Sequence, residues 1–531
     1  MNWRIMIAAC TAACWLPLGA QTQPNDTTLN RMVVVEQEYN PVITDANKIN
    51  VIPAVSPLTA PKRTVNYVLE ASPAGQVNNQ YMQAFTATEK PEKVAPGKVK
   101  LGYGSHGNLE ALAAYRLQCS DRDRVNIRFG MTGQDGRREQ MDKEAGKWDS
   151  RFYRTQAAAD WTHLFSQFAL NVAGDFGLSN FNFEPISLVG KQKFTSGAFH
   201  VGVASAAEQP IQFRAATNLL MYQRQHDVLD QKLQESILRT EAEVNAPINE
   251  QYRVGLFLQM DNQFYQHGNL KNQTSLQLNP YFLWQNDDWN IRLGAHVDPA
   301  FGYGKKLHVA PDVKAQVTIG NNYVFYTQAT GGKILNDFRR LEHLSPYSLL
   351  NHQTDATYEQ LNAAIGFRSS PLAGWWIHVF GGYQNLKNDL IEGQLWETQD
   401  TENLYAGLES RYAYKDRFYL TAKGVYRNWS TDKDAEEALC FKPTLEANVE
   451  AGIRPITPLL IQVGYQYITR EKVQGEKLDD VSNLYAEGHY QVFKFMNVYA
   501  RIQNLLNQNY AHHWGCQAMG LNFIGGVCFQ F

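Results

Sequence analysis

The sequence predicts an all-β protein: a transmembrane antiparallel β-barrel of roughly 22 strands, preceded by a proline-rich amino-terminal arm. Three observations predict this fold. Long segments alternate apolar and polar side chains, the last segment ends the chain on an aromatic residue, and short and long connections alternate. A period of two indicates strands, because successive side chains leave opposite faces.

The last hairpin, from Met496 to Phe531, shows the pattern most clearly. In its final run Phe523, Val527 and Phe531 share one phase, and no tail follows Phe531. A barrel in lipid can end this way, because its outer face is the apolar one. Taken alone, the hairpin also fits the edge strand of a soluble β-sandwich.

The same alternation recurs from Lys98 to the end, in segments of about ten residues with charge confined to one phase. Strands of soluble sandwiches average about five or six residues, which is too short to cross a bilayer. The charged phase is therefore expected to face a polar lumen, and the mixed signs of its residues name no substrate charge. The expected lumen-facing residues are Arg128, Arg239, Glu241, Glu243, Arg253, Asp261, Glu409, Arg411, Glu446, Glu450, Glu487 and Arg501.

The connections give a second test of the barrel. Short ones are expected near 121, 166, 209, 287, 321, 372, 415, 455 and 494. Mostly longer ones are expected at 133–150, 179–190, 226–234, 331–353, 385–401, 428–440, 469–482 and 505–516. This alternation is typical of outer-membrane barrels, in which short turns are periplasmic and long loops lie outside the cell.

The amino-terminal region divides into two parts. Residues 1–20 resemble a cleaved signal peptide, with Arg4 before an apolar run and Leu-Gly-Ala before Gln21. Residues 21–96 contain eight of the twenty prolines, which disfavours a packed domain and predicts an extended periplasmic or lumenal arm. Residues 97–531 are assigned to the barrel. No later run is apolar enough for a membrane-spanning helix, and a net charge of −3 gives no reason to expect nucleic acid.

Four cysteines follow the signal peptide: Cys119, Cys440, Cys516 and Cys528. His512, His513 and Cys516 lie in one loop, so they form either a metal site or, more simply, a polar loop with a thiol. Cys440 and Cys516 both fall in expected extracellular loops, where a disulfide between them is conceivable on redox grounds.

A hydrolytic site is a further alternative. Ser345 and Ser348 lie close in sequence to His343 and His352, but two serines and two histidines in one loop often occur by chance. The sequence therefore predicts no enzyme and no cofactor.

Three stretches resemble the barrel of TonB-dependent outer-membrane receptors. They are the closing hairpin (RIQNLLNQNYAHHWG…GLNFIGGVCFQF), a mid-barrel segment (FRRLEHLSPYSLLNHQTDATYEQLNAAIGF) and the first strands (KVKLGYGSHGNLEALAAY). The resemblance covers about Lys98 to Phe531 and implies 22 strands and an outer-membrane location. It also implies transport of a solute with a partner protein as gate or lid, either a periplasmic TonB-like protein or a surface lipoprotein.

One departure from the family pattern concerns the plug domain. About 76 proline-rich residues separate the signal from the first strand, too few for the family's plug, so a plug-less member is expected. Met32, Val33, Val34 and Val35 are similar in position and character to the TonB box. The same β-branched run also fits a strand that packs on this protein's own wall. The alternative to transport is a structural or assembly subunit of an outer-membrane complex.

Overall fold

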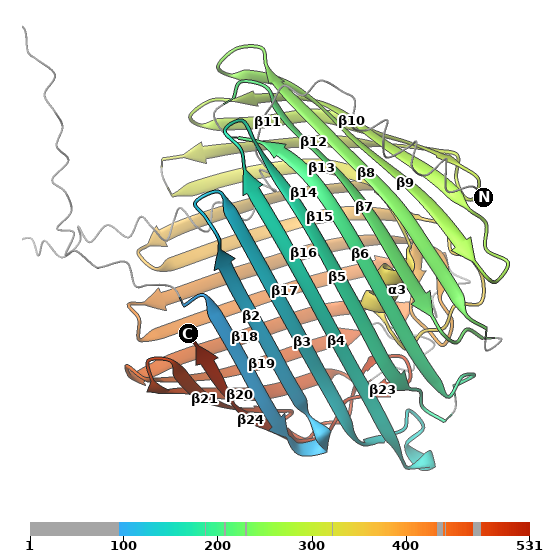
Figure 1. The fold of residues 1–531 in the computed structure, drawn as a ribbon, viewed down its shortest axis with the longest axis vertical. Coiled ribbons are helices and arrows are strands. Elements are labelled where there is room, and N and C mark those ends of the chain that lie inside the picture. Colours follow the sequence, from blue (N-terminus) through green and yellow to red (C-terminus); the bar gives the residue numbers. More distant parts are fainter. Residues whose placement is uncertain are drawn as a thin grey trace, which may run out of the picture.

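The computed structural model describes residues 95–531, apart from 186, 207–208, 229–230, 321, 433–438, 441 and 471–478. One antiparallel sheet of 22 strands runs through this region, and its first strand pairs with its last, which closes the sheet into a barrel (Figure 1). The predicted fold class and strand number are thus confirmed. Across the described residues, no helix has the length and apolar character needed to span a membrane.

The strands follow one another around the ring in chain order, and the small pair β22–β23 lies in the connection before the last of them. Their bounds are β1 (Gly97–Gly104), β2 (Leu109–Gln118), β3 (Asp123–Glu139), β4 (Lys147–Leu164), β5 (Phe168–Asn182), β6 (Lys191–Ser205), β7 (Gln212–Arg224), β8 (Leu233–Pro247), β9 (Tyr252–Gln266), β10 (Gln273–Gln285), β11 (Trp289–Phe301), β12 (Leu307–Ile319), β13 (Tyr323–Ile334), β14 (Thr357–Leu372), β15 (Trp375–Ile391), β16 (Glu397–Tyr414), β17 (Phe418–Ser430), β18 (Pro443–Ile456), β19 (Leu459–Arg470), β20 (Val481–Phe493), β21 (Met496–Gln503), β22 (Ala511–His513), β23 (Cys516–Gln517) and β24 (Asn522–Gln530).

The two ends of the barrel differ. At one end, here called the turn end, the described chain begins and ends side by side, with Gly97 N donating to Phe531 O at 2.8 Å. The short connections lie there. The opposite, loop end carries the short 3-10 helices η1 (Ser105–Gly107) and η2 (Lys143–Ala145), the connection 335–356 and the connection 504–521.

Strand length is the main correction to the sequence analysis. Strands were expected to have about ten residues, but β4 and β16 each have 18 and β3 and β15 each have 17. Most of 133–150 and 385–401, expected to be loops, is therefore strand. These hairpins continue beyond the apolar band with polar residues on both faces, so the alternation that marks a strand in sequence disappears.

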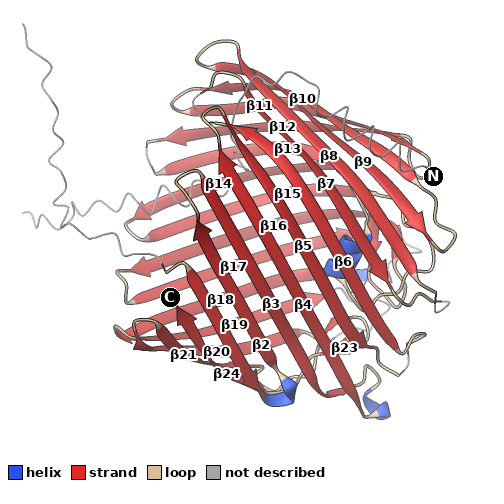
Figure 2. Ribbon diagram, in the orientation of Figure 1, coloured by secondary structure: helices blue, strands red, loops and turns tan. Residues whose placement is uncertain are grey.

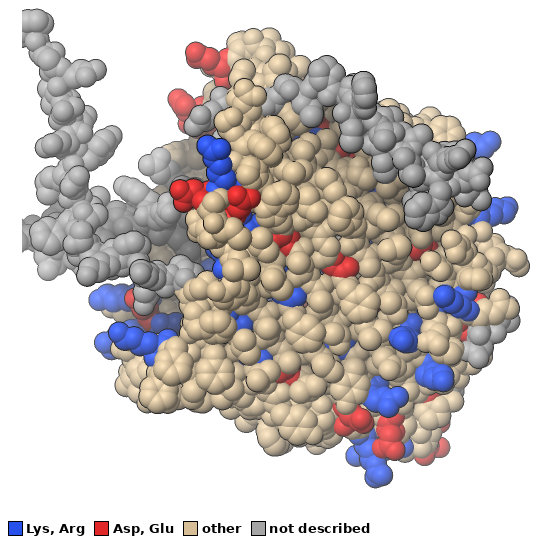
Figure 3. All heavy atoms as spheres, viewed as in Figure 1, with Lys and Arg blue, Asp and Glu red and all other residues tan. Residues whose placement is uncertain are grey.

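The outer face of the wall is apolar at its middle. Phe129, Phe176, Phe199, Leu256 and Leu293 are between 41% and 52% exposed. Figure 3 shows the face formed by β2–β9 as a broad, mostly uncharged field, with charged side chains gathered toward its edges. Such a band lowers the free energy of a barrel only in an apolar solvent such as lipid.

Candidate lumenal site beneath an inward-folded cap

The predicted lumen-facing residues share one phase of their strands, and most are held by cross-strand polar contacts. Arg239 Nε lies 2.6 Å from Asp261 Oδ1, and Glu409 Oε1 lies 2.6 Å from Lys423 Nζ. Further contacts join Arg128 to Asp160, Arg253 to Asn245, Glu243 to Arg214, Glu446 to Arg427, Glu487 to His489 and Arg501 to Glu110. Glu241 and Arg411 occupy the same phase, opposite Ala216 and Trp376. Charged side chains of both signs lie on this face, so the residues favour no single substrate charge.

Tyrosines on the same face lie over glycines of the neighbouring strand. A Cβ placed on Gly255 would lie 2.1 Å from Tyr281 Cζ, and one on Gly464 would lie 2.2 Å from Tyr485 Cζ. The glycine leaves room for the ring, which covers a backbone that has no side chain of its own. Tyr281 OH then donates to Glu243 at 2.8 Å, and Tyr485 OH donates to Glu450 at 2.8 Å. These tyrosines position the predicted carboxylates, and the sequence analysis missed them because a Gly–Tyr pairing depends on strand register.

The connection 335–356 folds against this polar face and is here called the cap. It begins with α3 (Phe338–Leu344), which Figure 2 shows within the outline of the barrel. Asp337 caps the helix by accepting from Arg340 N at 2.7 Å. Burial raises the pKa of the Asp337 carboxyl, although the hydrogen bond from Arg340 N–H acts in the opposite direction.

The carboxylate of Glu342 joins α3 to one wall of the barrel. Glu342 Oε1 accepts from Arg154 Nη2 at 3.0 Å and from Ser179 Oγ at 2.7 Å, and Glu342 Oε2 accepts from Tyr222 OH at 2.5 Å. These donors come from β4, β5 and β7. Arg339 Nη2 adds a hydrogen bond to the Gly197 carbonyl at 2.6 Å. Hydrogen bonds to a charged partner contribute about 1.5–3 kcal/mol each, so Glu342 is the principal polar attachment of the helix.

The cap continues to the opposite wall. Leu349 forms a parallel bridge to Leu395, with Leu349 N donating to Gln394 O and Trp396 N donating to Leu349 O, both at 2.8 Å. An apolar core surrounds this crossing, and each fully buried Leu or Phe contributes about 2 kcal/mol. Its buried members are Phe181, Phe183, Val189, Phe194, Tyr222, Leu233, Phe338, Leu341, Tyr347, Leu349, Leu350, Leu390, Trp396 and Cys516.

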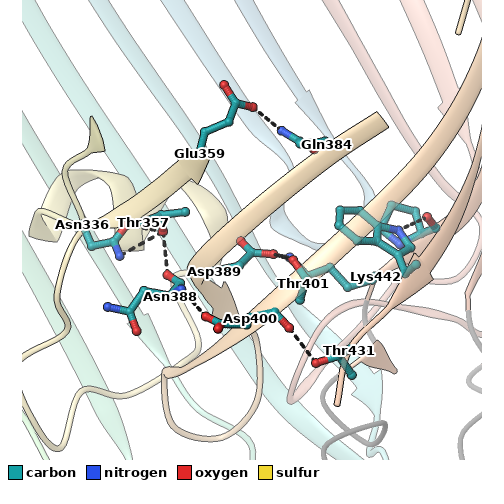
Figure 4. A network of polar contacts seen from close by, with 12 residues as sticks. Asn336, Thr357, Glu359, Gln384, Asn388, Asp389, Asp400, Thr401, Thr431 and Lys442 are labelled. Carbon is teal, nitrogen blue, oxygen red and sulfur yellow. Dashed lines mark hydrogen bonds and ion pairs between the residues drawn. The ribbon is translucent and has the colours of Figure 1, made fainter. Parts of the chain in front are cut away.

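A polar network joins the start of the cap to β14 and β15 (Figure 4). Asn336 Nδ2 donates to Thr357 Oγ1 at 3.2 Å, and Thr357 Oγ1 donates to the Asn388 carbonyl at 2.9 Å. Next to it, the buried carboxylate of Asp389 accepts from Lys442 Nζ at 2.5 Å. The cap is thus held at three places: where it joins β14, on the wall of β4–β7, and at the β15–β16 hairpin.

A cavity of about 560 Å³ lies between α3 and the wall formed by β2–β7. Its polar lining includes Arg128, Arg154, Asp175, Arg339 and Glu342, with Ala158 and Phe194 among its apolar members. Pockets that hold small molecules have about 300–1,000 Å³. The cavity is therefore large enough for a small solute, and its charges are of both signs.

The other sequence candidates do not form sites. Ser345 and Ser348 are fully buried; Ser348 Oγ donates to the Gly393 carbonyl at 2.8 Å and lies 3.3 Å from Ser345 Oγ. The serine hydroxyls therefore join the cap to its neighbours rather than to a histidine base, and the hydrolytic arrangement is not formed. His343 lines the cavity beneath the cap.

The His512, His513 and Cys516 group does not converge on a metal either. His513 Nδ1 lies 3.3 Å from Glu392, and Cys516 accepts from Arg138 at 3.0 Å. Within the described ranges, no three metal-ligating side chains come together. No disulfide joins Cys440 to Cys516 in the described part of the chain. Met32, Val33, Val34 and Val35 and the whole arm lie outside the described residues.

The strand order and the seam define the class of structure: a closed antiparallel barrel of 22 strands. No protein-family model and no curated protein matches the chain. Solved TonB-dependent receptors match it at 9–11% identity, so the predicted resemblance is confirmed for the fold.

Three of these structures show the extent of the match. The FrpB iron transporter from Neisseria meningitidis has 11% identity and a TM-score of 0.67, and the match covers 83% of this chain and 82% of that one. The ferric enterobactin receptor PfeA from Pseudomonas aeruginosa has 10% identity and a TM-score of 0.63, and the match covers 82% of this chain and 81% of that one. The ferric-catecholate import receptor Fiu from E. coli has 9% identity and a TM-score of 0.61, and the match covers 82% of each chain.

Proposed function

We propose that the protein is an outer-membrane transport protein in which a solute crosses through the barrel, with the cap as an obstruction on that path. The observation that carries this proposal is the cavity beneath the cap, whose helix α3 is joined to the wall of β4–β7 by the Glu342 carboxylate. A purely structural wall needs no such cavity. The fold neighbours, which are named as metal and siderophore transporters, support the same reading.

In this proposal the twelve predicted charged residues face the lumen and keep it polar without favouring one sign. The reversed orientation would put arginines into lipid, which costs about 2–4 kcal/mol for each one near the midplane. We also propose that a signal peptide directs export and that residues 21–96 form an arm at the inner wall or periplasmic mouth. In the same proposal the protein is a plug-less member of the barrel type.

The partners are proposed from the sequence and the fold likeness together. Met32, Val33, Val34 and Val35 would contact a periplasmic TonB-like protein, as an extended β-branched run can add to a sheet edge. A surface lipoprotein is the alternative gate. Outer-membrane lipid covers the apolar band, and no cofactor, catalytic activity or nucleic acid enters the proposed function.

The second candidate is a structural or assembly subunit of an outer-membrane complex. It is favoured by the bridge between Leu349 and Leu395, which ties the cap to the wall opposite α3. A closed barrel is sufficient for such a role, whereas transport requires that the crossing can open.

Conductance in planar bilayers separates the two candidates. The full chain, a Gln21–Ala95 deletion, Glu342→Ala and their combination would be compared in conductance and in the antibiotic sensitivity of cells. Transport predicts larger conductance in the deletion and in Glu342→Ala, with the largest in the combination and with assembly intact. If all four proteins remain non-conducting and co-purify in a stoichiometric complex, the transport proposal is wrong and the structural role holds.

A further inference from the structure

The seam between β1 and β24 joins the two ends of the described chain, and in the described ring no turn connects these two strands. The strands beside the seam are also the shortest of the ring. β1 and β21 have 8 residues each, β24 has 9 and β2 has 10, whereas the other strands of the ring have between 12 and 18. Short strands form fewer backbone hydrogen bonds, so contacts between side chains matter more on this side of the wall.

A row of four residues crosses the seam on the charged phase of its strands. Tyr499 of β21 lies opposite Gly526 of β24, and Glu110 of β2 lies opposite Gly102 of β1. The two glycines lie opposite each other. Neighbouring strands are about 4.8 Å apart, so about 14 Å separates the backbone of β21 from that of β2. A side chain from β21 can reach one from β2 only if the two residues between them leave the space free, which the glycines do.

The side chain of Tyr499 occupies that space. A Cβ placed on Gly102 would lie 2.1 Å from the Tyr499 hydroxyl oxygen, and one on Gly526 would lie 2.7 Å from Tyr499 Cε1. Tyr499 OH donates to Glu110 Oε2 at 3.0 Å, and Tyr499 is only 4% exposed. A hydrogen bond to a carboxylate therefore joins β21 to β2 directly over the two strands of the seam.

Two cations complete the arrangement around Glu110. Lys100 Nζ of β1 lies 2.9 Å from Glu110 Oε1 and 4.1 Å from the centroid of the Tyr499 ring. Arg501 Nη2 of β21 donates to Glu110 Oε2 at 3.3 Å. The carboxylate thus receives hydrogen bonds from both sides of the seam, and hydrogen bonds of this charge-assisted kind are roughly twice as strong as neutral ones.

From this geometry we propose that Tyr499 and Glu110 form a clasp that holds the barrel ring closed at its seam. If β1 moves away from β24, β2 moves with β1 and β21 moves with β24, because each of these pairs is joined by its own backbone hydrogen bonds. The distance between Tyr499 and Glu110 must then increase, so the seam cannot part without breaking the clasp. The seam is therefore the part of the wall that separates first when the clasp is lost. The proposal does not depend on the transport function or on the cap.

The clasp is tested in the full-length protein folded into nanodiscs, with hydrogen exchange of β1 and β24 as the measurement. Tyr499→Phe keeps the ring over the glycines and removes the hydrogen bond to Glu110. Exchange at the seam should accelerate roughly tenfold or more, because a hydrogen bond to a charged group is lost. The strands β10–β12, half a ring away, should keep their protection.

Tyr485→Phe is the matched control. Tyr485 OH also donates to a carboxylate, that of Glu450 at 2.8 Å, and it does so across a glycine, Gly464. The three strands involved, β18, β19 and β20, follow one another along the chain. Loss of this hydrogen bond should leave exchange at the seam as it is in the unaltered protein.

A disulfide across the seam gives an independent check, because Lys100 lies directly opposite Cys528. The Cα atoms of opposed residues in an antiparallel pair are about 4.5–5.5 Å apart, a separation that a disulfide spans. In Lys100→Cys combined with Tyr499→Phe, the oxidised protein should regain slow exchange at the seam and the reduced protein should not. Peptide mass spectrometry without reduction verifies the bond between positions 100 and 528.

The proposal is overturned if exchange at the seam in Tyr499→Phe is as slow as in the unaltered protein or in Tyr485→Phe. It is also overturned if the acceleration extends equally to β10–β12, since the variant would then destabilise the whole barrel. Failure of the bond to Cys528 to form, or to restore slow exchange once formed, would contradict it as well.

Discussion

At the scale of single residues, Glu342 has the largest expected effect on the cap. Its carboxylate receives three hydrogen bonds from three different strands of the wall, which fixes the orientation of α3 over the cavity. Leaving Arg154 and Tyr222 without their shared acceptor adds a desolvation cost to the lost contacts.

The first prediction concerns attachment of the cap. Glu342→Ala is expected to weaken attachment of α3 by about 2–4 kcal/mol, a net figure below the sum of its contacts because water replaces some of them. Hydrogen exchange of residues 338–344 should then accelerate by a factor of at least roughly thirty. Glu250→Gln, in the exposed turn between β8 and β9, is the control and should leave exchange unchanged. Unaltered exchange in Glu342→Ala would show that the apolar core and the other contacts of the cap hold α3 without this carboxylate.

The second prediction concerns pH and Asp337. Because burial raises the pKa of this carboxyl in the folded protein, the folded state binds its proton more tightly than the unfolded state. Its contribution to stability therefore falls as pH rises from the ordinary carboxyl value through the raised one, and is recovered as pH falls. Protection of α3 against exchange should increase on acidification through this window.

The variant that isolates this effect is Asp337→Asn. Asparagine also caps helices, so the hydrogen bond from Arg340 N is kept while the charge is lost. The pH dependence of α3 protection should become smaller than in the unaltered chain. An identical pH profile in both proteins would assign the dependence to other carboxyls.

At the scale of elements, the hairpins β3–β4 and β15–β16 extend well past the apolar band. Residues Asp135–Glu139 pair with Lys147–Arg151 in unbroken register, although neither run alternates apolar with polar residues. The backbone pairing of the alternating part of each strand continues into these extensions without a change of register. The alternation itself is needed only where one face of the strand contacts lipid. At the loop end, the extension of β15–β16 brings its connection into contact with the cap at Leu349.

The third prediction tests the register of β18. Glu446 and Asn448 pair with Ile468 and Gln466, while Ala447 and Val449 pair with Tyr467 and Tyr465. Glu446→Cys and Asn448→Cys should react with a membrane-impermeant thiol reagent, because their phase faces water in the proposed orientation. Ala447→Cys and Val449→Cys should not react, since Val449 is exposed on the apolar face.

This labelling is carried out in a chain with Cys119→Ser, because Cys119 is an exposed thiol. Labelling of the Ala447 and Val449 variants, with none of the Glu446 and Asn448 variants, would require the opposite orientation and would remove the proposed lumen-facing set.

At the scale of the whole molecule, the barrel depends on the seam between β1 and β24. Seven residue pairs from Lys98–Gln530 to Gly104–Ile524 close the ring. The strands approach closely there: a Cβ on Gly526 would lie 2.1 Å from the Leu101 carbonyl oxygen and 2.7 Å from Gly102 Cα. A clash with backbone atoms cannot be relieved by a rotamer change.

The fourth prediction follows from this close approach. Gly526→Ala should separate β24 from β1 or prevent closure, which would reduce the fraction of heat-modifiable, folded barrel several-fold. Gly424→Ala in β17 is the matched control, because no atom lies within 4 Å of the Cβ it would add. Equal folded fractions for both variants would show that the seam can widen at little cost.

The sequence by itself determined the wall. A barrel strand in lipid must present apolar side chains every second residue and must pair both of its edges, so period, strand number and closure by the last hairpin were readable without coordinates. The charged phase was readable for the same reason, since charge is confined to one phase in the alternating part of the strands.

Only the tertiary structure decided the cap, its cavity and the clasp across the seam. Glu342, Arg154, Ser179 and Tyr222 come from segments far apart in sequence, and no local pattern states that a polar loop will fold inward. The Gly–Tyr pairs depend on cross-strand register, and the polar hairpin extensions lack alternation. Each of these features arises from contacts between strands. The period-two pattern is a property of a single strand and therefore does not predict them.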